Sequence, residues 1–124
     1  MPIKHPVLCS VNQITELKSK KVILKRGKET IEVFIVRFKG KFHAYVNRCK
    51  HISLPLDWGD NDFFTSDGEF LMCKNHGAIY APDSGTCVAG PCAGQSLEAI
   101  PIRVVKGKIL YIEPSSTANN SAES

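Results

Sequence analysis

The chain has 124 residues, of which 43% are hydrophobic and 23% charged, and its formal net charge is +4 at pH 7. This length suits one domain with its own core, and the composition is that of a soluble globular protein. No apolar run reaches the roughly 18 residues that a membrane-spanning helix needs, and residues 1–6 do not resemble the start of a secretory signal. We therefore expect a cytoplasmic protein with no membrane partner.

Charged side chains are unevenly distributed along the chain. Residues 1–50 contain twelve basic residues (Lys or Arg) and three acidic ones (Asp or Glu). Residues 51–101 contain one basic residue and seven acidic ones. A basic stripe with interleaved aromatic residues can bind nucleic acid. Most of these lysines, however, flank turns or alternate with apolar residues, as on the solvated face of a sheet. We therefore expect no nucleic-acid partner.

The first part of the chain has the patterns of β-strands. The predicted strands are residues 7–11, 21–25, 30–38 and 42–46. Short turns that contain Gly, at residues 26–29 and 39–41, join the last three and predict a meander of antiparallel hairpins. Because residues 33–36 are apolar in succession, their strand should be covered on both faces. A helical turn fits residues 15–20.

The rest of the chain divides into an insert and a returning set of strands. Residues 47–92 are rich in Gly and Pro and leave room only for short strands. The strands predicted after residue 46 are 70–73, 78–80, 100–105 and 109–113. We predict an all-β fold in which the insert interrupts a base formed by residues 1–46 and 93–114. Residues 115–124 contain no large apolar side chain and are predicted to be a disordered tail.

Two short motifs in the insert each combine one thiol with one imidazole. Cys49-Lys50-His51 is followed, 21 residues later, by Cys73-Lys74-Asn75-His76. Both side chains of a motif lie within three or four positions, so one tight loop can direct them at the same metal centre. The candidate ligands are therefore Cys49, His51, Cys73 and His76.

A structural zinc site is one interpretation of these four residues, since zinc accepts two Cys and two His in tetrahedral geometry. Zinc fingers of the Cys2His2 type, however, place both Cys on one loop and both His on a helix. One thiol and one imidazole on each loop favour a two-iron centre, in which each loop gives its Cys to one iron and its His to the other.

The residues around the motifs carry a family resemblance. The pattern C-x-H followed by C-x2-H, with His76-Gly77-Ala78-Ile79-Tyr80 and the later Gly90-Pro91, resembles the Rieske [2Fe–2S] family. The resemblance covers residues 7–113. It implies the Rieske fold, with three stacked antiparallel sheets and the insert as a cluster-binding subdomain. It also implies one [2Fe–2S] cluster, held by Cys49 and Cys73 on one iron and by His51 and His76 on the other.

Within the family, the chain is most similar to the soluble ferredoxin branch. Rieske subunits of cytochrome bc complexes carry a membrane anchor and two further cysteines, where this chain has Leu54 and Asn75. The resemblance implies a one-electron carrier between a flavin reductase and an oxygenase, rather than an enzyme in itself. The alternatives are a small subunit or regulatory domain of a larger redox enzyme, such as nitrite reductase, and a zinc-stabilised interaction domain.

Several neighbouring residues are expected to tune the cluster. High-potential relatives have a Ser two residues after the second His and a Tyr four residues after it, whereas this chain has Ala78 and Tyr80. One retained hydroxyl donor implies an intermediate potential, although Tyr80 also fits the pattern of an ordinary packed aromatic residue. Lys50 and Lys74 directly follow the two Cys and either raise the potential and favour an acidic partner or are solvated loop lysines. Phe63 and Phe64 are predicted, with Trp58, to form the core of the insert.

Overall fold

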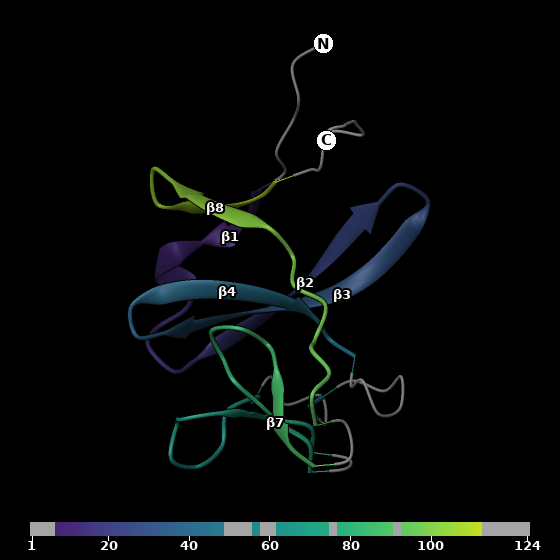
Figure 1. Ribbon diagram of the computed structural model, residues 1–124. Helices are drawn as coiled ribbons and strands as arrows, with labels where there is room; N and C mark the ends of the chain where they lie inside the picture. Colours follow the sequence, from purple (N-terminus) through teal and green to yellow (C-terminus); the bar gives the residue numbers. More distant parts are fainter. Residues whose placement is uncertain (1–6, 49–55, 58–61, 75–76, 91–92, 113–124) are drawn as a thin grey trace.

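The computed structural model describes residues 7–48, 56–57, 62–74, 77–90 and 93–112 (Figure 1). Within these residues lie nine β-strands and one short 3-10 helix, and the paired strands are antiparallel. The strands form three sheets of three strands each, which lie as layers in Figure 1. The prediction of an all-β fold built from stacked antiparallel sheets is confirmed. No helix among the described residues is long and apolar enough to cross a bilayer.

The middle sheet is the predicted meander. Its strands are β2 (Ser19–Arg26), β3 (Glu29–Phe38) and β4 (Lys41–Val46), in the order β2-β3-β4. A two-residue turn, Lys39-Gly40, joins β3 to β4, and both of its residues have positive φ angles, of 52° and 77°. That backbone twist matches the right-handed twist of the flanking strands, which is why Gly is favoured there.

The central strand β3 is covered on both faces, as its apolar run predicted. Val33, Phe34, Ile35 and Val36 all have 0% of their surface exposed. Successive side chains of a strand point to opposite faces. Phe34 and Val36 therefore belong to one core cluster and Val33 and Ile35 to another. The middle sheet separates two cores, and one strand contributes to both.

The two other sheets pack on opposite faces of the middle sheet (Figure 1). The upper sheet contains β1 (Val7–Ser10), β9 (Lys108–Tyr111) and β8 (Ile102–Val105), in that order. The lower sheet contains β5 (Leu71–Met72), β6 (Ile79–Tyr80) and β7 (Cys87–Ala89). The lower sheet is formed by the predicted insert, and Cys73 of the second motif shares the core cluster of Phe34 on β3.

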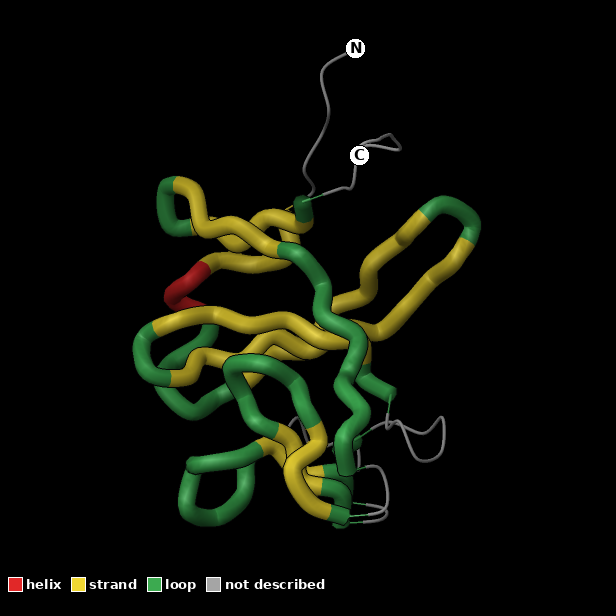
Figure 2. Tube along the Cα trace, in the orientation of Figure 1, coloured by secondary structure: helices red, strands yellow, loops and turns green. Residues whose placement is uncertain are grey.

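Two details differ from the sequence-based expectation. The helical turn predicted at residues 15–20 is wrong: the 3-10 helix η1 is Val11–Gln13, the helical segment in Figure 2. Leu17 has a φ of 63° and donates its N–H to the carbonyl oxygen of Arg37 at 2.8 Å, so pairing with β3 begins where a helix was expected. Strand β7 was not predicted. The predicted tail, 115–124, lies outside the described residues.

Candidate metal centre

Of the four predicted ligands, the structure describes Cys73. Cys49, His51 and His76 lie outside the described residues, so their arrangement stays a prediction. Cys73 directly follows β5 and has 0% of its surface exposed. Among the described residues, no group of three His, Cys, Asp or Glu side chains is arranged to hold a metal ion.

The loop that begins at Cys73 is closed by two backbone hydrogen bonds. The Cys73 N–H donates to the carbonyl oxygen of Ala78 at 2.8 Å, and the Gly77 N–H donates to the carbonyl oxygen of Cys73 at 2.8 Å. Gly77 has a φ of 73°, a conformation that residues with a Cβ rarely adopt. Backbone hydrogen bonds therefore hold Cys73, Gly77 and Ala78, the described ends of the connection between β5 and β6.

The segment that carries the first motif is also closed at its ends. It lies between Asn47, directly after β4, and Leu56. The Leu56 N–H donates to Oδ1 of Asn47 at 2.8 Å, and the Lys74 N–H donates to the carbonyl oxygen of Leu56 at 2.8 Å. Leu56 therefore connects the end of the first motif's segment to the residue that follows Cys73.

Gly90, in a third loop between Cys87 and Gly94, lies close to the residues that follow the second motif. The Gly94 N–H donates to the carbonyl oxygen of Cys87 at 3.0 Å and closes the loop. A Cβ placed on Gly90 would lie 2.8 Å from Cα of Ala78 and 3.3 Å from the carbonyl oxygen of Gly77. Because both of these atoms belong to the backbone and cannot move aside easily, a residue with a Cβ does not fit at position 90 without a backbone shift.

Apolar side chains exclude water beneath these loops. The ring of Phe34 stacks on that of Phe63, with centroids 4.1 Å apart and planes at 7°. Leu56, Phe63, Leu71 and Tyr80 are all fully buried in the same cluster as Cys73. The prediction of a small hydrophobic core in the insert is confirmed for Phe63 and Phe64, while Trp58 lies outside the described residues.

The two residues expected to tune the cluster are both inside this core. Ala78 and Tyr80 each have 0% of their surface exposed and lie at β6 in the cluster that contains Cys73. Tyr80 is the larger of the two and is among the largest fully buried side chains of the protein. Both residues therefore share the core cluster of Cys73, the thiol that the sequence assigned to the cluster, and the role of the Tyr80 hydroxyl stays a prediction.

Lys74 is not the solvated loop lysine that the sequence allowed. Its side chain is 13% exposed, and Nζ lies 3.5 Å from Oδ2 of Asp62, whose side chain is 65% exposed. The nearby acidic residue offsets the lysine charge, which weakens the expectation that Lys74 attracts an acidic partner. Lys50 lies outside the described residues.

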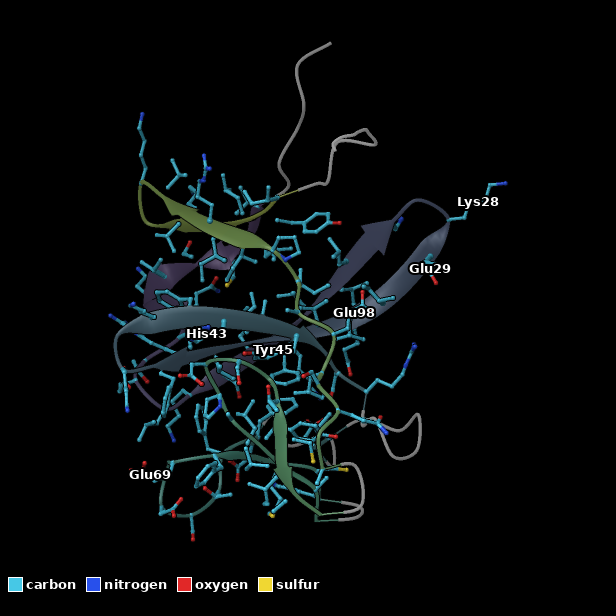
Figure 3. All side chains as sticks on the ribbon, in the orientation of Figure 1. Lys28, Glu29, His43, Tyr45, Glu69 and Glu98 are labelled. Carbon is cyan, nitrogen blue, oxygen red and sulfur yellow. The ribbon has the colours of Figure 1, made fainter. Side chains whose placement is uncertain are left out.

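A buried tyrosine connects the middle sheet to the lower one. Tyr45, on β4 (Figure 3), donates its hydroxyl to the carbonyl oxygen of Pro82 at 2.7 Å. Burial, together with the charge of Asp83, raises the pKa of Tyr45 to about 12. The hydroxyl is therefore protonated at physiological pH and acts as a hydrogen-bond donor between the layers.

Sequence reasoning missed a group of polar residues at the two described ends of the segment that contains the first motif. Lys21 and Asn47 both contact Asp57, beside Leu56, and Asn47 also contacts Glu32. The available signal in the sequence was Asn47, a polar residue that directly follows an apolar strand and lies two residues before Cys49. The fixed loop ends and the dry apolar core suit a buried centre with thiolate and imidazole ligands, so the residues present fit an iron–sulfur cluster.

Comparison with known proteins identifies the family of this chain. The model of the Rieske [2Fe-2S] domain matches residues 5–106. The chain belongs to the Rieske [2Fe–2S] family. A Rieske domain implies a [2Fe–2S] cluster.

One curated relative of this Rieske chain is the ferredoxin component of the alkene monooxygenase system of Xanthobacter autotrophicus. The two are 35% identical over 79 residues, which is 64% of this chain and 60% of the relative. The match therefore spans less than two thirds of the length of that relative.

Solved structures share the fold of this Rieske chain. The ferredoxin of Sphingomonas yanoikuyae B1 has a TM-score of 0.68 at 20% identity, with 90% of this chain and 100% of that one covered. The carbazole 1,9a-dioxygenase ferredoxin of Nocardioides aromaticivorans IC177 has a TM-score of 0.67 at 21% identity, with 88% of this chain and 97% of that one covered. The terminal oxygenase of carbazole 1,9a-dioxygenase from Novosphingobium sp. KA1 has a TM-score of 0.73 at 21% identity, over 93% of this chain and 31% of that one.

Proposed function

We propose that this Rieske protein is a one-electron carrier that accepts electrons from a flavin reductase and donates them to an oxygenase. The support is twofold: the sequence relative is named as the ferredoxin component of a monooxygenase system, and the fold is that of solved ferredoxins covered almost completely. The proposed carrier is not an enzyme in itself. It would act in the cytoplasm, where NAD(P)H supplies flavin enzymes with electrons.

The proposed ligands of its one [2Fe–2S] cluster are Cys49, His51, Cys73 and His76. When bound, such a cluster accepts one electron more readily than a four-Cys cluster does, because two neutral imidazoles replace two thiolates. The single observation that carries this proposal is the closure of the two motif segments on each other through Leu56 and Lys74. This hydrogen bond between Lys74 and Leu56 joins the described end of the first motif's segment to the residue after Cys73, which supports the proposal that both motifs serve one cluster.

The same arrangement supports the proposed domain boundaries. We propose one Rieske domain at residues 1–114, with its base at 1–46 and 93–114 and its cluster-binding insert at 47–92. Leu56, Phe63 and Leu71 of the insert share one core cluster with Phe34 of the base. The described residues of the insert thus share their core with the middle sheet, which supports one domain rather than two.

The carrier role is tested by reconstitution. The purified protein is mixed with a flavin reductase, NADH and a Rieske-type oxygenase from the same genome, and substrate oxidation is followed with and without the protein. We expect the oxidation rate to rise with the concentration of the protein and to be lost in Cys73→Ser. Reductase and oxygenase that turn over equally well without it, or a protein that takes up no electron reversibly, would contradict the proposal.

A second candidate is a Rieske subunit of a larger redox enzyme. It is favoured by the structural match to a terminal oxygenase, in which the Rieske-like part is 31% of the chain. A subunit of this kind remains bound to its catalytic partner through purification, whereas a carrier dissociates between electron transfers. Gel filtration of the tagged protein from its native cells separates the two candidates.

A further inference from the structure

Four polar side chains meet at the ends of the segment that carries Cys49 and His51. Nζ of Lys21, on β2, lies 2.9 Å from Oδ2 of Asp57. Nδ2 of Asn47 donates to Oδ1 of Asp57 at 3.2 Å and to Oε1 of Glu32, on β3, at 2.8 Å. We call these four residues, Lys21, Glu32, Asn47 and Asp57, the closing network.

The closing network is buried to an extent unusual for charged groups. The side chain of Asp57 is 1% exposed and that of Lys21 is 24% exposed, and Asn47 as a whole is 6% exposed. Moving a carboxylate out of water is unfavourable unless cations and donors compensate for the lost hydration. Here an ammonium group and an amide donor both contact Asp57, so its charge is compensated where it lies.

The amide of Asn47 can have only one orientation in this network. Carboxylates without a proton only accept hydrogen bonds, and a backbone N–H only donates. The Nδ2 group must therefore face Glu32 and Asp57, which leaves Oδ1 for the N–H of Leu56 at 2.8 Å. An aspartate at position 47 would present an acceptor to two carboxylates and would repel them.

The register of β2 with β3 determines on which face of the middle sheet the closing network lies. In the register of β2 with β3, Lys21 is opposite Phe34 and Ile23 is opposite Glu32. Lys21, Glu32 and Phe34 therefore share the face of the middle sheet that packs on the insert. The Asn47 N–H also donates to the carbonyl oxygen of Glu32 at 2.8 Å, so the backbone leaves β4 in a fixed direction.

We infer that Asn47 is a positioning residue, and that the closing network holds the segment carrying Cys49 and His51 in the geometry that the cluster requires. Asn47 connects the two ends of this segment through Leu56, and Leu56 connects it to Lys74, beside Cys73. The network thus sets the placement of both pairs of proposed ligands from one rigid sheet. This inference rests on the proposed function, since it assumes that those residues hold a cluster.

The test compares the holoprotein with Asn47→Asp and with Glu32→Ala, a milder change that removes one carboxylate from the amide. Asn12→Asp is the matched control, because Asn12 is exposed on the base. Ile35→Val, in the core cluster that the insert does not share, controls for general destabilisation. The readouts are the rate of iron release to a chelator, the width of the EPR signal of the reduced cluster, and hydrogen exchange at the Leu56 amide.

For Asn47→Asp we expect iron release at least tenfold faster, broadened EPR features and loss of protection at the Leu56 amide. Glu32→Ala should change all three readouts in the same direction by less, and Asn12→Asp should match the wild-type protein. Unchanged release, EPR width and exchange in Asn47→Asp would overturn the inference alone. If Ile35→Val and a closing-network variant have equal thermal midpoints and release iron equally fast, general destabilisation explains the release, and this result would also overturn the inference. A wild-type protein that binds no cluster would overturn the proposed function and this inference together.

Discussion

Gly90 and Ala78 approach each other so closely that a Cβ on Gly90 would lie 2.8 Å from Cα of Ala78. This contact joins Gly90, directly after β7, to the residue directly before β6. Gly90 has a φ of 100°, so both its conformation and its contact exclude a side chain. Gly94, with a φ of 91°, has a similar conformation, and a Cβ added there would meet nothing within 4 Å.

Gly90→Ala should therefore be more harmful than Gly94→Ala. A positive φ alone costs a residue with a Cβ about 1–2 kcal/mol, and only Gly90→Ala adds a collision with backbone atoms. We expect Gly94→Ala to lower the free energy of unfolding by that amount and to leave the visible spectrum unchanged. Gly90→Ala should lower the free energy of unfolding further and accelerate iron loss. Equal effects in urea unfolding and iron release would show that the contact with Ala78 does not matter.

Tyr80→Phe and Ala78→Ser should move the midpoint potential in opposite directions. If the Tyr80 hydroxyl donates to the cluster, its removal lowers the potential, and a hydroxyl added at position 78 raises it. The expected shift is a few tens of millivolts, since about 59 mV for one electron corresponds to about 1.4 kcal/mol, close to a net hydrogen-bond energy. Protein-film voltammetry measures the midpoint potentials of both variants. Potentials that stay at the wild-type value in both variants would make Tyr80 a packed aromatic residue only.

Tyr45→Phe should destabilise the fold without changing the cluster. The variant leaves the buried carbonyl oxygen of Pro82 without the donor at 2.7 Å, which costs about 1–3 kcal/mol. Chemical unfolding measures this loss. The midpoint potential should be unaffected, because Tyr45 acts between the middle and lower sheets rather than at a proposed ligand.

The same tyrosine predicts a loss of stability at high pH. The pKa of Tyr45 is about 12 in the folded protein, against an ordinary value of 10.0. Between these values the unfolded chain gives up the proton that the folded protein keeps, so the free energy of unfolding falls as pH rises from 10 toward 12. The difference between wild type and Tyr45→Phe should shrink over this window. A difference that is constant with pH would contradict the raised pKa.

Much of the fold followed from local sequence patterns. The runs at 30–38 and 42–46 are rich in β-branched and aromatic residues and are separated by Lys39-Gly40-Lys41, and they predicted two strands of the meander nearly at their observed bounds. Strand β7 escaped prediction because it has three residues, two of them exposed, and a loop closed by Gly94 follows it. The expected helical turn at 15–20 failed because pairing with Arg37, a contact distant in sequence, determined the backbone at Leu17.

The candidate site, like the fold, could be predicted only where it depends on residues close together in the sequence. The spacing of the two motifs predicted candidate ligands, and Tyr80 and Ala78 were placed beside them by counting from His76. The closing network was not predicted, because Lys21, Glu32 and Asp57 are brought together by strand register and by burial. Lys74 was left with two interpretations for the same reason: its pairing with Asp62 depends on how the insert folds.

The central claim, that the two motifs bind a Rieske cluster, is tested most directly by metal analysis and EPR of the protein purified without oxygen. We predict a brown protein with about two irons and two acid-labile sulfides per chain. After reduction with dithionite, its EPR signal should have an average g value below that of four-Cys clusters. Colourless protein with stoichiometric zinc and no sulfide would contradict the account.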